Sequence, residues 1–124
     1  MDTVVVEDRI EEMEQAYEQK DFAKFGELMM KDSNQFHATC LDTYPPIFYL
    51  NATSQRIIHL VHQYNAYHKQ VRAAYTFDAG PNAVLFVEEP FAAEFQRLLG
   101  YYFPHPWWYV GSHCLYVCIF QHYI

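Results

Sequence analysis

The chain has 124 residues, of which 52% are hydrophobic and 19% are charged, so it suits one globular domain and is too apolar to be disordered. Its net charge of −7 argues against a nucleic-acid-binding surface, and no apolar run approaches the ~20 residues that span a bilayer. The three cysteines do not resemble a secreted disulfide framework, and the N-terminus lacks the pattern of a signal peptide. We therefore expect a cytoplasmic protein with neither nucleic acid nor membrane as a partner.

Two helices are predicted at the start of the chain. Apolar residues at helical spacing among acids and glutamines predict a helix over residues 7–19, with acids in its first turn, where they suit the helix dipole. Asp21 is the expected N-cap of a second helix. Pro45 and Pro46 end this helix, because neither proline can donate a helical hydrogen bond.

A third helix and a pair of strands follow. Thr53 or Ser54 could cap the helix, and the run from Asn51 to Thr53 suits a helix start better than a glycosylation site. Residues 71–77 and 83–87 are two short apolar runs separated by a Gly-Pro turn. This pattern predicts two antiparallel strands.

A fourth helix is expected after the strands. Pro90 suits its first turn, and Gly100 is expected to end it. Residues 101–124 contain no acid, lysine or arginine, and we interpret them as a divergent aromatic tail. Within this tail, residues 115–120 are a candidate strand that could cover one edge of the sheet.

The most informative stretch runs from residue 75 to residue 83, where an apolar strand ends in Asp78 and a tight turn follows. Gly80 permits a positive φ and lets a ligand approach the main chain. Successive N–H groups in such a turn can bind an anion. A carboxylate beside a candidate phosphate site is typical of a catalytic centre, although Asp before a glycine-containing turn is also common as a structural residue.

Two long blocks resemble one enzyme family. They are residues 30–51, MKDSNQFHATCLDTYPPIFYLN, and residues 74–86, AYTFDAGPNAVLF. Both are similar to the C-terminal part of mevalonate diphosphate decarboxylase, in its eukaryotic form. That family belongs to the superfamily of galactokinase, homoserine kinase, mevalonate kinase and phosphomevalonate kinase.

The resemblance implies an α+β fold of the ferredoxin-like kind, in which helices back an antiparallel sheet that lacks strands at both ends. It implies an ATP- and Mg²⁺-dependent lyase of isoprenoid and sterol synthesis, acting on mevalonate diphosphate, and a homodimer. Asp78 matches the family's catalytic aspartate, which can accept or orient the proton of the substrate hydroxyl. The loop beside it lies near bound substrate in the family and corresponds to Ala79, Gly80, Pro81 and Asn82.

The family's phosphate-binding loop, its substrate-contacting lysine and its serine-arginine segment correspond to nothing in this sequence. We therefore interpret residues 1–100 as a fragment of the C-terminal, substrate-side domain and residues 101–124 as the foreign tail. Two functions follow. One is the decarboxylase activity, which the fragment is not expected to perform efficiently alone. The other is a non-catalytic truncated form or interaction module of the same enzyme.

Other polar residues have plainer interpretations. Ser33 and Asn34 could face the active cleft, but local hydrogen bonds along the helix are favoured for Ser33, and His37 stays open between the two. No residue is assigned as a metal ligand. A zinc site is a minor alternative to buried thiols for four residues of the tail, which are His113, Cys114, Cys118 and His122.

Overall fold

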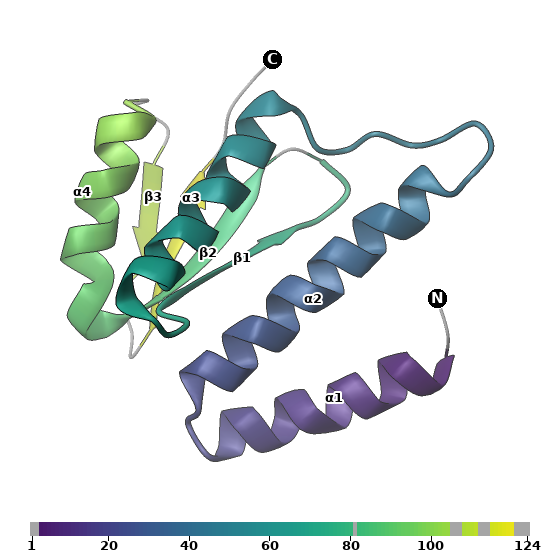
Figure 1. Ribbon diagram of the computed structural model, residues 1–124, viewed down its shortest axis with the longest axis horizontal. Coiled ribbons are helices and arrows are strands. Elements are labelled where there is room, and N and C mark those ends of the chain that lie inside the picture. The colour runs from purple at the N-terminus through teal and green to yellow at the C-terminus, as the bar shows by residue number, and fades with distance from the viewer. Residues whose placement is uncertain (1–2, 81, 105–107, 112–114, 121–124) are drawn as a thin grey trace.

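The computed structural model describes residues 3–80, 82–104, 108–111 and 115–120. Within these residues, helices pack against one antiparallel sheet, so the predicted α+β class is confirmed (Figure 1). The elements are α1 (Thr3–Glu18), α2 (Phe22–Leu41), α3 (Ala52–His68), β1 (Ala73–Phe77), β2 (Ala83–Glu88), η1 (Glu89–Phe91), α4 (Ala92–Tyr102), β3 (Trp108–Gly111) and β4 (Leu115–Phe120).

The first two helices form a hairpin beside the sheet (Figure 1). α1 begins at Thr3 rather than at residue 7, so its first turn contains no acid and the predicted dipole interaction there is wrong. Asp21 caps α2 as predicted, since its carboxylate accepts a hydrogen bond of 3.1 Å from the backbone N–H of Lys24. α2 then runs without a break to Leu41.

A capping box begins α3. The side-chain oxygen of Asn51 accepts the Ser54 N–H at 2.9 Å, and the Asn51 N–H donates back to the Ser54 hydroxyl at 3.4 Å. Asn51 is therefore the cap and Ser54 is the third helical residue. The predicted cap at Thr53 or Ser54 is wrong, because both residues lie inside the first turn of the helix and Asn51 precedes it.

The predicted strand pair is confirmed. β1 and β2 pair antiparallel from Ala73 opposite Val87 to Phe77 opposite Ala83. β4 pairs with the other side of β2, as expected for residues 115–120, and β3 pairs with β4. The order β1-β2-β4-β3 leaves β1 at an edge of the described sheet, with Asp78 directly after its last residue.

The fourth helix differs from its predicted bounds. Pro90 lies in the short 3₁₀ turn η1, which leads into α4. Gly100 does not end α4, which continues to Tyr102. Glycine inside a helix costs about 1 kcal/mol relative to alanine. The burial of the adjacent Leu99 provides a packing contribution that opposes this cost.

The hydrophobic core lies between the sheet and the helices α3 and α4. The largest fully buried apolar side chains come from these elements and are Ile57, Val61, Tyr75, Leu85, Val87, Phe95 and Leu99. α2 packs closely on β1 at Gly26, where an added Cβ would lie 3.1 Å from the Cβ of Ala74. This close approach brings the following turns of α2 alongside the end of β1.

None of the described helices is both long enough and apolar enough to cross a bilayer.

Candidate active site

Asp78 is the first residue after β1 and is exposed. Its backbone carbonyl accepts a hydrogen bond of 2.8 Å from the N–H of Gly80, which makes the turn tight. The structure thus places Asp78 at the end of a strand and before a turn, as predicted, and shows in addition that the residue is exposed.

Two side chains of α2 hold the residue that precedes Asp78. The hydroxyl of Ser33 accepts the Phe77 N–H at 3.1 Å, and Nε2 of His37 lies 3.0 Å from the Phe77 carbonyl oxygen. A carbonyl can only accept, so Nε2 of His37 carries the proton. Ser33 and His37 are 3% and 6% exposed, and we call this pair the Phe77 clamp.

The clamp corrects the simpler interpretation of Ser33. Its hydrogen bond connects residues 44 positions apart and is not local to the helix. Ser33 and His37 are four residues apart, so they lie on the same face of α2. The sequence shows two polar residues at this helical spacing, but neither their burial nor their common partner could be read from it.

Aromatic rings surround the clamp. The ring of His37 contacts the ring of Phe77 edge-on at 6.3 Å and that of Tyr49 at 6.2 Å. Phe36 stacks on Tyr49 with ring centroids 6.3 Å apart. These contacts join the connection between α2 and α3 to the strand end that carries Asp78.

A third polar side chain of α2 reaches the middle of β1. The buried hydroxyl of Tyr75 donates to Oδ1 of Asn34 at 2.8 Å, and Nε2 of His62, from α3, lies 3.1 Å from the same hydroxyl. Burial raises the pKa of Tyr75 above its ordinary value, against the opposing influence of Asn34. Tyr75 therefore stays protonated and connects β1 to both helices.

Gly80 does not contribute to an anion nest of the kind that the sequence suggested. It has no positive φ, and its N–H is bonded to the Asp78 carbonyl, so this N–H is not a free donor. Proline has no N–H, which removes Pro81 as a donor, although its placement lies outside the described residues. An added Cβ at Gly80 would meet no atom within 4 Å, so a ligand can approach the backbone there. Ala79 and Asn82 are exposed beside it.

A cavity of ≈ 670 Å³ lies at the other end of the β1–β2 pair and does not include Asp78. Its lining joins the turn between α1 and α2 to the end of β2. The acids in this lining are Glu18, Asp21, Glu88 and Glu89, against one lysine, Lys20. A diphosphate would be repelled by this excess of carboxylates, so the cavity does not compete with the Asp78 end as a substrate site.

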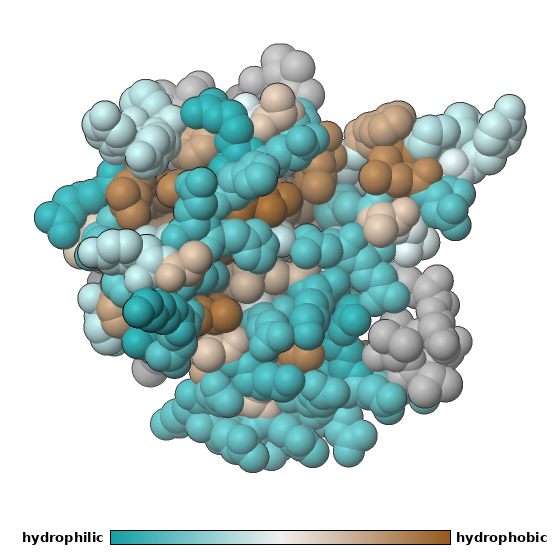
Figure 2. Space-filling model, in the orientation of Figure 1, coloured by the Kyte–Doolittle hydropathy of each residue, from teal (hydrophilic) through white to brown (hydrophobic). Residues whose placement is uncertain are grey.

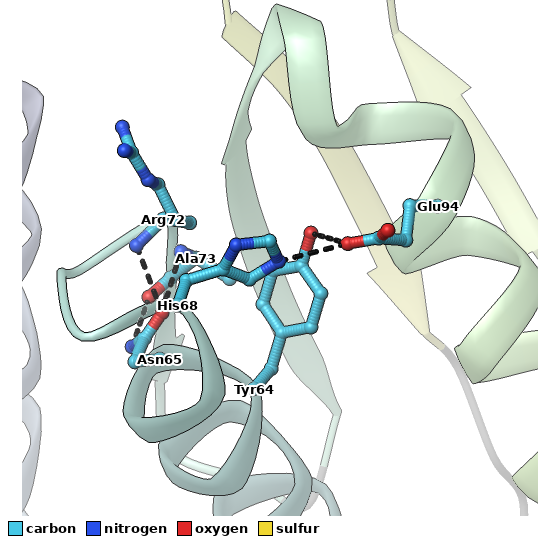
Figure 3. A network of polar contacts seen from close by, with 6 residues as sticks. All are labelled: Tyr64, Asn65, His68, Arg72, Ala73 and Glu94. Carbon is cyan, nitrogen blue, oxygen red and sulfur yellow. Dashed lines mark hydrogen bonds and ion pairs between the residues drawn. The ribbon is translucent and has the colours of Figure 1, made fainter.

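Asn65 supplies hydrogen bonds that a neighbouring strand would otherwise give to β1 (Figure 3). Its side-chain oxygen accepts the N–H groups of Arg72 at 2.8 Å and Ala73 at 3.0 Å, and its amide donates to the Ala73 carbonyl at 2.8 Å. Asn65 is 8% exposed. It therefore holds the start of β1, as the Phe77 clamp holds its end.

The carboxylate of Glu94, on α4, forms hydrogen bonds with two side chains of α3, which Figure 3 also shows. The Tyr64 hydroxyl donates to its Oε1 at 2.8 Å, and Nε2 of His68 lies 2.8 Å from the same oxygen. The hydrogen bonds from Tyr64 and then His68 lower the pKa of Glu94. Burial, followed by the bond to Glu94, raises the pKa of Tyr64. This network joins α3 to α4 and lies apart from Asp78.

The described residues contain no group of three or more His, Cys, Asp or Glu side chains that could hold a metal ion. The alternative zinc site is not tested by this, because His113, Cys114 and His122 lie outside the described residues, as does the side chain of Cys118.

The comparisons with known proteins agree on one family. Residues 2–113 match the family model described as the mevalonate 5-diphosphate decarboxylase C-terminal domain. The diphosphomevalonate decarboxylase of Danio rerio is 60% identical over 100 residues, which are 81% of this chain and 25% of that protein. A crystal structure of mevalonate 5-diphosphate decarboxylase is 48% identical with a TM-score of 0.78, over 81% of this chain and 26% of that one. A structure described as "MDDEF in complex with MVAPP, AMPPCP and Magnesium" is 30% identical with a TM-score of 0.72, over 93% of this chain and 32% of that one.

The chain therefore belongs to the mevalonate 5-diphosphate decarboxylase C-terminal domain family, and the predicted resemblance is confirmed. It spans about a quarter of the length of the Danio rerio relative that it matches. The family match reaches residue 113, beyond the predicted domain boundary at residue 100, and that boundary stays a prediction.

Proposed function

We propose that this chain serves in the ATP-dependent decarboxylation of mevalonate diphosphate to isopentenyl diphosphate, a step of isoprenoid and sterol synthesis. The observation that carries the proposal is the exposed carboxylate of Asp78 after a strand end held by Ser33 and His37. Membership of the decarboxylase family supports it, as does the binding of MVAPP, AMPPCP and magnesium by a solved relative.

In this proposal Asp78 handles the proton of the substrate's tertiary hydroxyl. The hydroxyl oxygen bonds to the terminal phosphorus of ATP, ADP leaves, and the carboxylate accepts the proton. The bond between the substrate's tertiary carbon and the phosphate oxygen then breaks, and its electron pair leaves with the phosphate. The carbon–carbon bond to the substrate's own carboxylate also breaks. Its electron pair forms the new double bond as carbon dioxide leaves. A carboxylate nearby favours positive charge that develops on the tertiary carbon.

The loop of Ala79, Gly80, Pro81 and Asn82 is proposed to contact the substrate. The open space above Gly80 is suited to a ligand that lies close to the backbone. Because the Gly80 N–H is already bonded, we assign phosphate binding to other parts of a decarboxylase.

ATP is the proposed co-substrate and Mg²⁺ the proposed metal. The described residues contain no group of three or more His, Cys, Asp or Glu side chains that could hold a metal ion, so no residue of the chain is assigned to Mg²⁺. We therefore derive no step through the ion. The isolated chain is expected to show little or no turnover, because the family's phosphate-binding loop corresponds to nothing in this sequence.

The homodimer and the cytoplasmic location also remain proposals. Both rest on the resemblance to the decarboxylase family and, for the location, on the low cysteine count. Sedimentation at several concentrations tests the first, and imaging of a tagged chain tests the second.

The test uses a chimaeric decarboxylase, in which this chain replaces the matching 100-residue segment of the Danio rerio enzyme. Asp78→Asn should lower kcat for carbon dioxide release by about 10²–10⁴, the usual contribution of a general base. Asp8→Asn changes another exposed aspartate, on α1, and should leave kcat unchanged. An active chimaera that tolerates Asp78→Asn would contradict the proposed role. A chimaera that is folded but inactive with Asp78 intact would favour the non-catalytic alternative.

A further inference from the structure

The cavity at the end of the β1–β2 pair away from Asp78 combines aromatic rings with carboxylates. Its volume of ≈ 670 Å³ lies within the roughly 300–1,000 Å³ of small-molecule sites. Apart from its acids and one lysine, the lining is apolar and consists of Ala16, Tyr17, Phe22, Phe25 and Pro90. Figure 2 shows a mostly hydrophilic surface over α1, so this apolar lining sets the cavity apart from the helix beside it.

The turn between α1 and α2 positions the aromatic side chains of the cavity. Lys20 has a φ of 55°, in the left-handed region that often follows the end of a helix. The N–H of Asp21 donates to the Ala16 carbonyl at 2.9 Å, which reverses the chain. This reversal places the ring of Tyr17 against that of Phe25, with centroids 6.4 Å apart. Phe25 also packs against the hydrophobic core, so the aromatic wall is anchored to the fold.

Two of the four acids in the lining are free to meet a ligand. Asp21 is the cap of α2, and Glu88 forms an ion pair with Arg72 at 3.2 Å. Glu18 and Glu89 are exposed, and neither forms an ion pair within the described part of the chain. Because the lining contains only one lysine against these acids, it favours a positively charged group and repels an anion.

The chain already holds one cation in this way at the margin of the cavity. The central guanidinium carbon of Arg72 lies 4.5 Å from the ring centroid of Phe91, and the same guanidinium pairs with Glu88 of the lining. A ring face and a carboxylate together bind an organic cation, because the ring adds a cation–π attraction to the ionic one. Inside the cavity, the ring of Tyr17 and the unpaired carboxylate of Glu18 provide the same two components.

We propose that this cavity binds a small organic cation, which is an ammonium or guanidinium group on an apolar body. The apolar body lies against the rings of Tyr17 and Phe25, and the cationic group lies beside Glu18 and Glu89. This site is independent of the proposed function, because it lies away from Asp78 and repels an anionic diphosphate.

Three probes that share one apolar body and differ in charge test the proposal by NMR titration of this chain. Phenethylamine is a cation at neutral pH, as alkylamines are, whereas phenethyl alcohol is neutral and hydrocinnamate is an anion. Phenethylamine should shift the amide signals of Tyr17, Phe25 and Glu89 and should saturate them. Its affinity should exceed that of phenethyl alcohol by about fivefold, the upper range for one exposed ion pair, and hydrocinnamate should bind more weakly than either.

Single substitutions assign the charge and the ring separately. Glu18→Gln and Glu89→Gln should each weaken phenethylamine binding by about two- to fivefold and leave phenethyl alcohol unaffected. Glu7→Gln is the matched control, because it removes an exposed acid of α1 that lies outside the lining. Tyr17→Leu keeps an apolar side chain without the ring and should weaken phenethylamine binding by about two- to fivefold. Tyr67→Leu, at an 80% exposed ring on α3, should not.

Equal affinities for the cationic and the neutral probe would overturn the proposal, and so would unchanged phenethylamine binding in both glutamine variants. Shifts of the same amides on concentrating the chain without a probe would also overturn it, in favour of a second copy as the occupant. The comparison of probes uses the parent chain and does not depend on the folding of a variant. For the variants, an unchanged signal from the fully buried Tyr75 shows that the fold is intact.

Discussion

Replacing Ser33 with alanine tests whether the Phe77 clamp holds the strand end before Asp78. The change removes the acceptor of the Phe77 N–H, bonded at 3.1 Å by a side chain that is 3% exposed. A buried donor left unpaired costs about 1–3 kcal/mol. With a urea m-value of about 1–3 kcal/mol/M, the unfolding midpoint should fall by about 1 M.

Thr39→Ala is the matched control on the same helix. Its hydroxyl is exposed and bonds only to the Gln35 carbonyl of its own helix, at 2.9 Å, so its loss should cost less than about 0.5 kcal/mol. Amide exchange gives the local readout. The Phe77 amide should exchange roughly 5–150-fold faster in Ser33→Ala, which is the same energy expressed as a ratio. If the two variants unfold alike and Phe77 keeps its protection, the clamp does not hold this strand end.

Two further predictions concern the other polar contacts. Asn65→Ala leaves the edge of β1 without three hydrogen bonds and should lower the free energy of unfolding by about 2–4 kcal/mol; a urea titration in which it matches the exposed control Gln63→Ala would contradict this. Glu94 has a pKa lowered by Tyr64 and then His68, so its contribution to stability is present above its ordinary pKa of 4.5 and lost as pH falls through the lower folded value. Urea midpoints below pH 4.5 should therefore fall more steeply for the parent chain than for Glu94→Gln, and parallel curves would refute the coupling.

The helices and strands could be predicted because their signals lie close together in the chain. Asp21 needs only the N–H of Lys24, three residues on, to act as a cap. The antiparallel pairing of β1 and β2 follows from two apolar runs and the short connection between them. The same locality explains the errors, since Asn51 and Ser54 are both good capping residues and only the geometry decides which one accepts the helical N–H.

The candidate site could be predicted only in part. The position of Asp78 followed from the apolar run before it and the turn after it, whereas its exposure is known from the structure alone. The conformation of Gly80 did not follow, because glycine permits a positive φ without requiring one, and here its N–H bonds to the Asp78 carbonyl instead. The partner of Ser33 lies 44 residues away, and a contact at that separation depends on how α2 packs against β1.

The packing of α2 against an edge strand also explains how Asp78 can be held and exposed together. A neighbouring strand beyond β1 would satisfy the backbone of Phe77, but it would also cover the carboxylate that follows. Ser33 and His37 provide the same two hydrogen bonds from side chains and leave that space open. Asn65 does this at Ala73, so both ends of the strand are paired without a further strand. This edge of the described sheet is therefore closed to pairing at these two residues. A site built this way holds the backbone before the carboxylate in place and leaves the carboxylate itself exposed.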